Sequence, residues 1–215
     1  MITLGLDTTA SRCAASLVSD TKYLGSFSED IGRGHAERIA PMVGELLERV
    51  NLSAADIDRI AVCIGPGSFT GLRVALSFAR GFALPRKLPV IGLSALRVLA
   101  AQADPTRIRR IISVIDVRRD ELCWAAYFKG QEIISPHTQS RDEAIFTIKQ
   151  MGFDRLAGDG AHYIDGSADY PNVHEIILAW MSRNLDPKNH PPNPLYARGP
   201  DAKLPGGVDP NLAPK

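Results

Sequence analysis

The segment Ile2-Thr3-Leu4-Gly5-Leu6-Asp7-Thr8-Thr9 is a short apolar run that ends in an aspartate and two threonines. Such a run predicts a buried strand followed by a turn. Two more strand-like runs follow at residues 14–18 and 23–27, with a polar turn between them. The chain therefore opens with a strand, a turn and an antiparallel hairpin before any helix is reached.

The same order of elements returns, more loosely, from Arg110. Apolar runs at 110–116, 122–128 and 132–135 again predict three strands, the first of which ends in Asp116. Two βββαβα units of this kind describe an α/β protein with the actin-like ATPase (ASKHA) architecture, here with a degenerate second unit. Two alternatives remain, a doubly wound parallel sheet and two unrelated α+β domains. The early hairpin counts against the doubly wound sheet.

Two helices are predicted in the first unit. Residues 35–50 carry apolar side chains at helical spacing with charged residues off the stripe, which is typical of an amphipathic helix. A helix from about residue 68 to residue 84 is apolar nearly all round, so we expect more than one of its faces to be buried. The pattern is equally compatible with burial inside the unit and with contact to a partner protein.

A glycine-rich stretch lies between the strand predicted at 59–64 and the second helix. It reads Gly65-Pro66-Gly67-Ser68-Phe69-Thr70-Gly71-Leu72-Arg73. Its glycines and hydroxyl groups could form an anion nest, or a tight turn with Gly65 or Gly67 at positive φ and Ser68 as helix cap. It is not a P-loop, because no Gly-Lys-Ser/Thr follows at the required spacing. We interpret it mainly as the turn that begins the second helix.

Features for nucleotide binding are incomplete. Asp7-Thr8-Thr9 stands where an actin-like ATPase has a metal-orienting acid and phosphate-binding hydroxyl groups, although an Asx-type turn explains the same residues. The matching Asp116-Val117-Arg118-Arg119 has arginines where a phosphate loop normally has glycine. Gly158-Asp159-Gly160 could imitate an adenosine-binding glycine pair, but the aspartate interrupts it. We therefore expect a degenerate nucleotide site and no tightly bound cofactor.

No catalytic or metal-binding set is predicted. The five histidines never fall three to five residues apart, and the three cysteines form no C-x-x-C pair. A net charge of +1 gives no basic footprint, so any RNA should be bound only through another subunit. No apolar run is long enough for a membrane span and the N-terminus does not resemble a signal peptide, so we expect a cytoplasmic protein without membrane contact.

Domain boundaries are expected at two changes in composition. Asp104-Pro105-Thr106 interrupts the helical pattern that precedes it, and eight of the fifteen prolines lie between Pro187 and Pro214. We predict a first subdomain at 1–104, a second at 105–185 with a last helix at 175–182, and a proline-rich extended tail at 186–215.

Several segments together resemble the TsaB (YeaZ) family. They are Ile2 to Thr9, His35 at the start of its helix, Gly65 to Arg73, Val90 to Ser94, Ile115 to Arg118, Glu121 to Tyr127, and Pro194 to Arg198. The resemblance implies a non-catalytic partner or activator of the paralogue TsaD, working with the ATPase TsaE. That assembly transfers a threonylcarbamoyl group to N6 of adenosine 37 in tRNAs that read codons starting with A. ATP and metal are then expected on the partner subunits.

The resemblance also implies how partners are contacted and that this chain binds no catalytic metal. TsaD has a histidine pair, four residues apart, that binds metal; the matching positions here are Ala95 and Leu99. TsaB-type proteins pair with TsaD, or with themselves when alone, through the two helices of the first subdomain. The residues expected at this interface are Ile39, Met42, Val43, Leu46, Phe69, Leu72, Leu76 and Ala79. The alternatives are a stand-alone ATPase of actin-like fold, an M22-type metallopeptidase-like enzyme and a sugar kinase.

Overall fold

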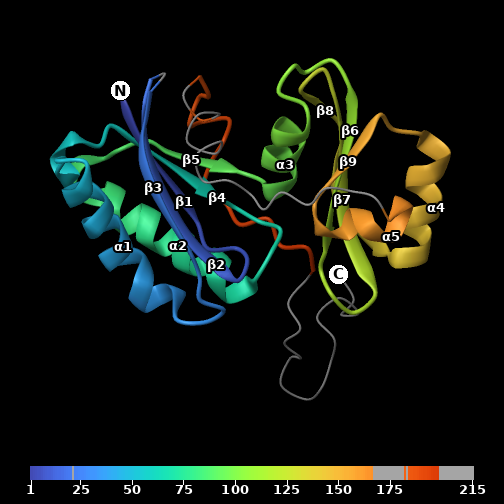
Figure 1. The fold of residues 1–215 in the computed structure, drawn as a ribbon, viewed down its shortest axis with the longest axis horizontal. Helices are drawn as coiled ribbons and strands as arrows, with labels where there is room; N and C mark the ends of the chain where they lie inside the picture. Colours follow the sequence, from blue (N-terminus) through green and yellow to red (C-terminus); the bar gives the residue numbers. More distant parts are fainter. Residues whose placement is uncertain (21, 167–181, 183, 199–215) are drawn as a thin grey trace, which may run out of the picture.

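The computed structural model describes residues 1–20, 22–166, 182 and 184–198, which fold around two sheets (Figure 1). The first sheet has the strand order β3-β2-β1-β4-β5. Its strands are β1 (Ile2–Asp7), β2 (Arg12–Ser19), β3 (Lys22–Asp30), β4 (Arg59–Cys63) and β5 (Val90–Leu93). β1 pairs antiparallel with β2 and parallel with β4, and β2 pairs antiparallel with β3, so the predicted opening hairpin is confirmed.

Helices cover both faces of this sheet. Side chains alternate between the two faces along each strand, and apolar residues of β4 point to both. On β4, Ile60 and Val62 join the core formed with α1 (His35–Arg49) and α2 (Phe69–Ala83). Ala61 and Cys63 point to the opposite face, toward α3 (Ala95–Ala103). Ser68 and Ser94 accept hydrogen bonds from helix amides at the starts of α2 and α3, as their positions predict. We call this sheet with α1 and α2 the first subdomain.

The second sheet has the order β8-β7-β6-β9 and repeats the first arrangement. Its strands are β6 (Arg110–Asp116), β7 (Glu121–Phe128), β8 (Gln131–Ser140) and β9 (Arg155–Ala157). The remaining elements are α4 (Arg141–Met151), α5 (His162–Asp165) and the 3₁₀ turns η1 (Ala54–Asp56), η2 (Leu84–Arg86) and η3 (Asp159–Ala161). α4 and α5 pack on one face, and we call this sheet with them the second subdomain. The duplicated strand–strand–strand–helix–strand order predicted from the sequence is confirmed.

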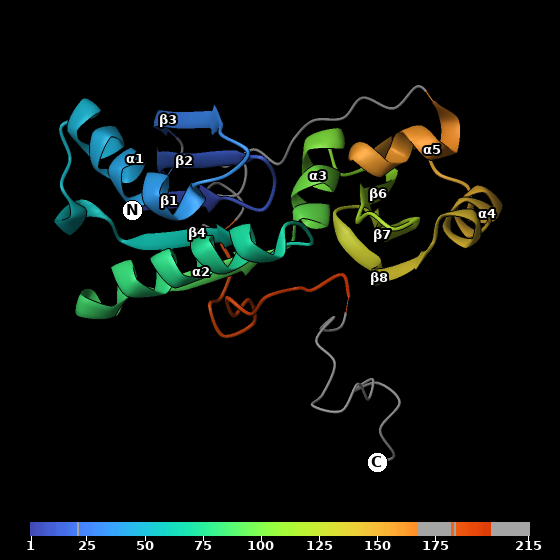
Figure 2. The ribbon, with the colours of Figure 1, turned by 90° about the horizontal axis from the view of Figure 1, so that it is seen from below.

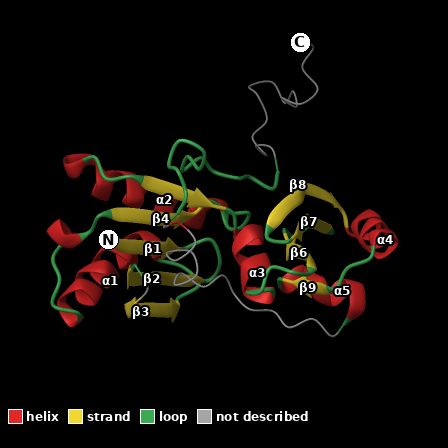
Figure 3. Ribbon diagram, turned by 90° about the horizontal axis from the view of Figure 1, so that it is seen from above, coloured by secondary structure: helices red, strands yellow, loops and turns green. Residues whose placement is uncertain are grey.

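The helix α3 lies between the two sheets (Figures 1 and 3). Its Ala95 and Val98 pack against the first sheet, whereas Leu96 and Leu99 belong to a core with residues of β6 and β7. The helix therefore joins the two subdomains through apolar contacts on both of its sides. Among the described helices, none has the length and hydrophobicity that a membrane span requires.

Residues 184–198, which we call the strap, run along the surface from the first subdomain to the second (Figure 2). The amide of Gly92 donates to the His190 carbonyl at 2.9 Å, and the amide of Leu195 donates to that of Ile64 at 2.7 Å. Farther along, the Thr138 hydroxyl donates to the Ala197 carbonyl at 2.8 Å. The described part of the predicted tail begins with a hydrogen-bonded turn from Asp186 to His190 and then follows the surface. The helix predicted at 175–182 lies outside the described residues, apart from Ser182.

Candidate functional site

The Gly65–Arg73 stretch is the junction between β4 and α2, and it packs directly on the turn that follows β1. The Thr8 hydroxyl donates to the carbonyl of Gly71 at 2.6 Å. The amide of Ser68 donates to the carbonyl of Thr9 at 2.7 Å. The two conspicuous polar motifs of the first subdomain are therefore hydrogen-bonded to each other.

Two glycines of the stretch are required by this contact. A Cβ added at Gly67 would lie 2.3 Å from the carbonyl oxygen of Thr9, and one added at Gly71 would lie 1.9 Å from that of Thr8. Both distances are far inside van der Waals contact, and the obstructing atoms are backbone. The glycines thus make room for the β1 turn.

The tight-turn interpretation of the stretch agrees with its geometry. Gly65 has φ of 92°, which glycine adopts without strain. The Ser68 hydroxyl accepts a hydrogen bond from the Gly71 amide at 3.2 Å and caps α2. Since the Ser68 amide is bound by Thr9, two of the amides that would have formed an anion nest already have partners.

Asp7 is buried and bound by its own turn. One carboxylate oxygen accepts the amide of Thr9 at 2.8 Å and its hydroxyl at 2.6 Å, which is the Asx-type turn considered from the sequence. Burial raises the pKa of Asp7, while the bonds from Thr9 oppose that rise. The side chain of Asp7 is therefore held by its own turn. The Cys63 sulfur lies 3.6 Å from the hydroxyl oxygen of Thr9.

The cysteine thiols have no features of nucleophiles. Cys13, Cys63 and Cys123 are all buried. Burial raises the pKa of Cys13 to about 11 and raises those of Cys63 and Cys123 as well. A thiol must ionise to react, so these groups are unreactive in the folded protein at neutral pH.

The corresponding turn of the second subdomain follows Asp116. Arg118, Arg119 and Asp120 all have positive φ, at 67°, 54° and 63°, a conformation that is uncommon for residues other than glycine. The Asp116 carboxylate accepts the Arg118 amide at 2.7 Å and the Tyr163 hydroxyl at 3.1 Å. This aspartate is therefore also engaged by its own subdomain.

Gly158 and Gly160 lie beside this turn, and packing on β6 explains both. A Cβ at Gly158 would lie 2.2 Å from the Val114 carbonyl oxygen, and one at Gly160 would lie 2.8 Å from a Val114 methyl group. Between them, Asp159 accepts the Asp116 amide at 2.9 Å. The predicted residues Asp116, Gly158 and Gly160 are thus brought together.

Several backbone amides of these turns already have partners within the protein. The Thr9 amide donates to Asp7, the Ser68 amide donates to Thr9, and side chains of arginine occupy the turn after Asp116. Close approach of a phosphate needs free backbone amides and room beside them. Among the residues that the structure describes, no group of three His, Cys, Asp or Glu side chains is placed to hold a metal ion.

A groove of about 440 Å³ runs between α1 and α2 on the outer surface of the first subdomain. Its lining is Ala36, Ile39, Phe69, Thr70, Arg73, Val74, Ser77 and Phe78. The Arg73 guanidinium lies 3.7 Å from the centre of the Phe69 ring and donates to the Tyr196 hydroxyl at 3.2 Å. Tyr196 of the strap thus contacts Arg73 and Phe69, two residues that line this apolar groove, and Arg73 gives the groove a positive charge.

The structure corrects the residues predicted for a partner interface. Seven of the eight are between 0% and 3% exposed and form the core of the first subdomain, namely Ile39, Met42, Val43, Leu46, Leu72, Leu76 and Ala79. Phe69, at 51% exposed, is the exception, and Ile39 lines the groove although it is almost fully buried. The strongest helical stripe faces the sheet, because the core buries the most continuous apolar surface.

The accessible apolar surface of α2 comes from a second stripe that the sequence prediction missed. Val74, Phe78 and Phe82 are spaced four residues apart, so they lie on one face of the helix. They are only partly buried, and Val74 and Phe78 line the groove. The sequence did carry a sign of this second stripe, because the helix is apolar on nearly all of its faces.

Comparison with known proteins agrees with the class of fold. The chain has the actin-like ATPase fold, which it shares with the activator of 2-hydroxyisocaproyl-CoA dehydratase from Clostridium difficile, at a TM-score of 0.52, 11% identity and coverage of 84% of this chain and 92% of that one. YeaZ from Pseudomonas aeruginosa is more similar, with a TM-score of 0.72 and 27% identity over 91% of this chain and 99% of that one.

Residues 11–163 match the TsaD family, described as tRNA N6-adenosine threonylcarbamoyltransferase. The chain is 38% identical over 129 residues to the tRNA threonylcarbamoyladenosine biosynthesis protein TsaB of Escherichia coli (strain K12). That match covers 60% of this chain and 55% of the relative. The chain belongs to this family and, within it, to the TsaB (YeaZ) group.

Proposed function

We propose that this chain is a non-catalytic partner subunit in the biosynthesis of threonylcarbamoyladenosine on tRNA. Its relative in Escherichia coli is named for that pathway. The proposed partners are a TsaD-type transferase and a TsaE-type ATPase, which would carry the metal and the ATP. A homodimer is the proposed state of the isolated chain.

One observation carries the non-catalytic part of the proposal. The β1 turn, where an actin-like enzyme would receive phosphate, is filled by α2 through the contacts of Thr8 with Gly71 and of Thr9 with Gly67. The residues that characterise the family are thus engaged in building the first subdomain. We infer that ATP binding by this chain is weak or absent.

The groove between α1 and α2 supports the partner role. It is lined by Phe69, which is 51% exposed, and by the half-buried Val74 and Phe78, and a second protein would bury these side chains favourably. Arg73 at its end would select a partner with a carboxylate at the matching position, because a guanidinium binds a carboxylate with good geometry.

The test is co-purification of the chain with the TsaD and TsaE candidates of the same cell, followed by measurement of threonylcarbamoyladenosine in tRNA. Phe78→Glu places a charge in the groove and should weaken association at least tenfold, as about 1.4 kcal/mol corresponds to tenfold in affinity. Phe146→Glu is the matched control, because Phe146 is 67% exposed on α4 of the other subdomain.

Two results would count against the proposal. The first is a folded Phe78→Glu variant that assembles and supports tRNA modification as well as the control does. The second is ATP turnover by the isolated chain that falls when Asp7 is replaced by Ala, since this would make the chain an enzyme in its own right.

A further inference from the structure

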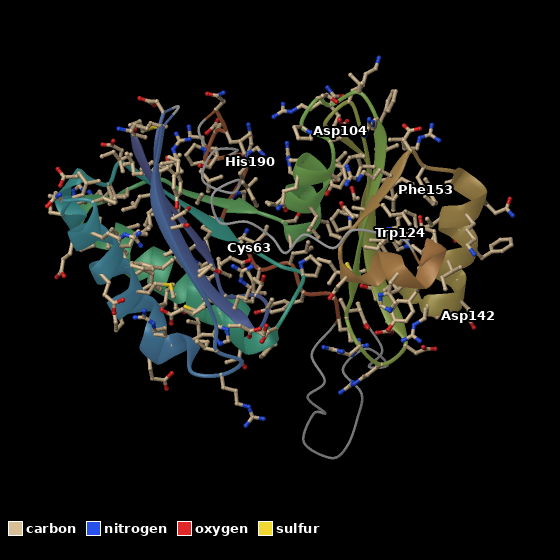
Figure 4. All side chains as sticks on the ribbon, viewed as in Figure 1. Cys63, Asp104, Trp124, Asp142, Phe153 and His190 are labelled. Carbon is tan, nitrogen blue, oxygen red and sulfur yellow. The ribbon has the colours of Figure 1, made fainter. Side chains whose placement is uncertain are left out.

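One end of the second sheet gathers five cationic side chains. β6 begins there at Arg110, β7 ends there at Phe128, and β9 begins there at Arg155, since Arg110 pairs with Phe128 and Ile111 with Arg155. We call the cations at this end the basic edge. They are Arg107, Arg109, Arg110, Lys129 and Arg155. Figure 4 shows Asp104 at this end of the sheet and Asp142 at the other end.

The carboxylates near the basic edge mostly bind backbone and hydroxyl groups. Asp104 accepts the Thr106 hydroxyl and the backbone amide of Arg109, and these bonds lower its pKa. Asp154 accepts the backbone amide of Arg110 at 2.6 Å. Asp104 and Asp154 thus shape the loop before β6. Glu132, at the same end of β8, accepts the Ser135 hydroxyl at 2.8 Å, and the five cations outnumber these three acids.

Two of the cations occupy backbone positions that favour other residues. Arg107 has φ of 56° and Lys129 has φ of 52°, whereas asparagine and glycine tolerate this left-handed region best. The positions are adjacent, since a Cβ at Gly130 would lie 2.8 Å from the Arg107 side chain. Lys129 and Gly130 form the two-residue turn between β7 and β8, where Asn-Gly is the favoured pair. A cation is present at each position despite this preference.

Exposed apolar groups lie among these charges. Ile108 is 66% exposed, and Phe128 is 38% exposed with the Lys129 ammonium 5.3 Å from its ring centre. Cations that bind phosphates, interleaved with a flat ring on which an unpaired base can stack, are typical of surfaces that bind RNA.

From these observations we infer that the basic edge contacts the tRNA directly, through its phosphates and an unpaired base. The inference rests on the proposed function for the identity of the RNA. Few cations take part, so the edge adds affinity to an RNA held mainly by the transferase and does not replace it. RNA is favoured over an acidic protein because RNA carries both phosphates, which bind the cations, and bases, which can stack on the ring of Phe128.

The test is the tRNA affinity of the assembled complex, measured by fluorescence anisotropy over a range of salt concentrations. The double variant Arg107→Asn with Lys129→Asn removes two charges and suits the left-handed backbone, so it should fold at least as stably as the wild type. Lys87→Asn is the matched control, because Lys87 has φ of 53° and precedes β5 in the first subdomain.

The double variant should weaken tRNA binding, and its plot of log affinity against log salt should be shallower by roughly 1 to 2. The Lys87→Asn control should change neither the tRNA affinity nor its dependence on salt. Equal binding by the double variant and the control would overturn the inference. Normal tRNA affinity with impaired complex assembly would also overturn it, because the edge would then be a protein interface.

The same comparison on the isolated full chain at low salt separates this inference from the proposed function. If the wild-type chain forms no complex but binds tRNA weakly, and the double variant loses that binding, the proposed partner role fails and the RNA contact stands. If neither the wild type nor the variant binds tRNA in either setting, the inference fails.

Discussion

Replacing Gly71 by Ala tests the packing that explains the family's glycine-rich stretch. The added methyl group would lie 1.9 Å from the Thr8 carbonyl oxygen and 3.0 Å from its carbon. The start of α2 must therefore move away from the β1 turn, and the 2.6 Å bond from the Thr8 hydroxyl to the Gly71 carbonyl is strained or lost.

The expected loss of stability comes from three contributions. Overpacking costs about 1–3 kcal/mol, and a lost hydrogen bond costs about 1 kcal/mol. Alanine in a helix returns about 1 kcal/mol relative to glycine. The net destabilisation is about 2 kcal/mol, which lowers the melting temperature of a chain of this size by roughly 4–8 °C.

Gly81→Ala is the matched control. Gly81 lies in the same helix and is exposed, and a Cβ there would meet nothing within 4 Å. This variant should be stabilised by about 0.5–1 kcal/mol. Thermal unfolding followed by circular dichroism measures both. The reasoning is refuted if Gly71→Ala is as stable as Gly81→Ala, because the Thr8 contact would then not be what requires glycine.

Three further predictions concern buried groups and the strap. Since burial raises the pKa of Cys13 to about 11 and raises those of the other two thiols, an aromatic disulfide reagent at pH 8 should react with the folded protein roughly a hundredfold more slowly than with the protein in urea. Burial raises the pKa of Asp7, so the folded state keeps a proton that the unfolded chain loses above about pH 4. Wild-type stability should therefore fall as pH rises through the folded pKa, and denaturant unfolding of Asp7→Asn should lack this fall. Arg198→Ala removes the bond to Glu121, and hydrogen exchange at the Leu195 amide should become roughly tenfold faster; an unchanged rate would mean that this contact does not hold the strap.

Most of the fold could be predicted because buried strands and amphipathic helices leave periodic patterns. β8 shows where this reasoning is weak. The sequence predicts a strand only at 132–135, but β8 extends over Gln131–Ser140. It is an edge strand with mostly polar and partly exposed residues, and Pro136 is tolerated there because an edge strand has amides that need no partner. Pairing with β7, from Glu121 opposite Ser140, defines its length.

The candidate site was harder to predict than the fold. Periodicity identifies which residues of α1 and α2 are apolar, but it does not show which apolar stripe faces the sheet. The stripe with Leu72 and Leu76 fills the core, so the partly buried stripe with Val74 and Phe78 lines the groove. The need for Gly71 depends on Thr8, more than sixty residues away in the chain, and local sequence carries no sign of that contact.

The strap affects how the two subdomains can move. Two subdomains joined by a single linker can rotate about it in any direction. Two subdomains that are also bound to each other at separate points keep little rotational freedom. Here residues 104–110 link the two subdomains, and the strap adds attachments at Gly92 and Ile64 on one subdomain and at Thr138 and Glu121 on the other. A clamshell motion would have to detach the strap first. The strap therefore opposes a change in the angle between the groove of the first subdomain and the basic edge of the second.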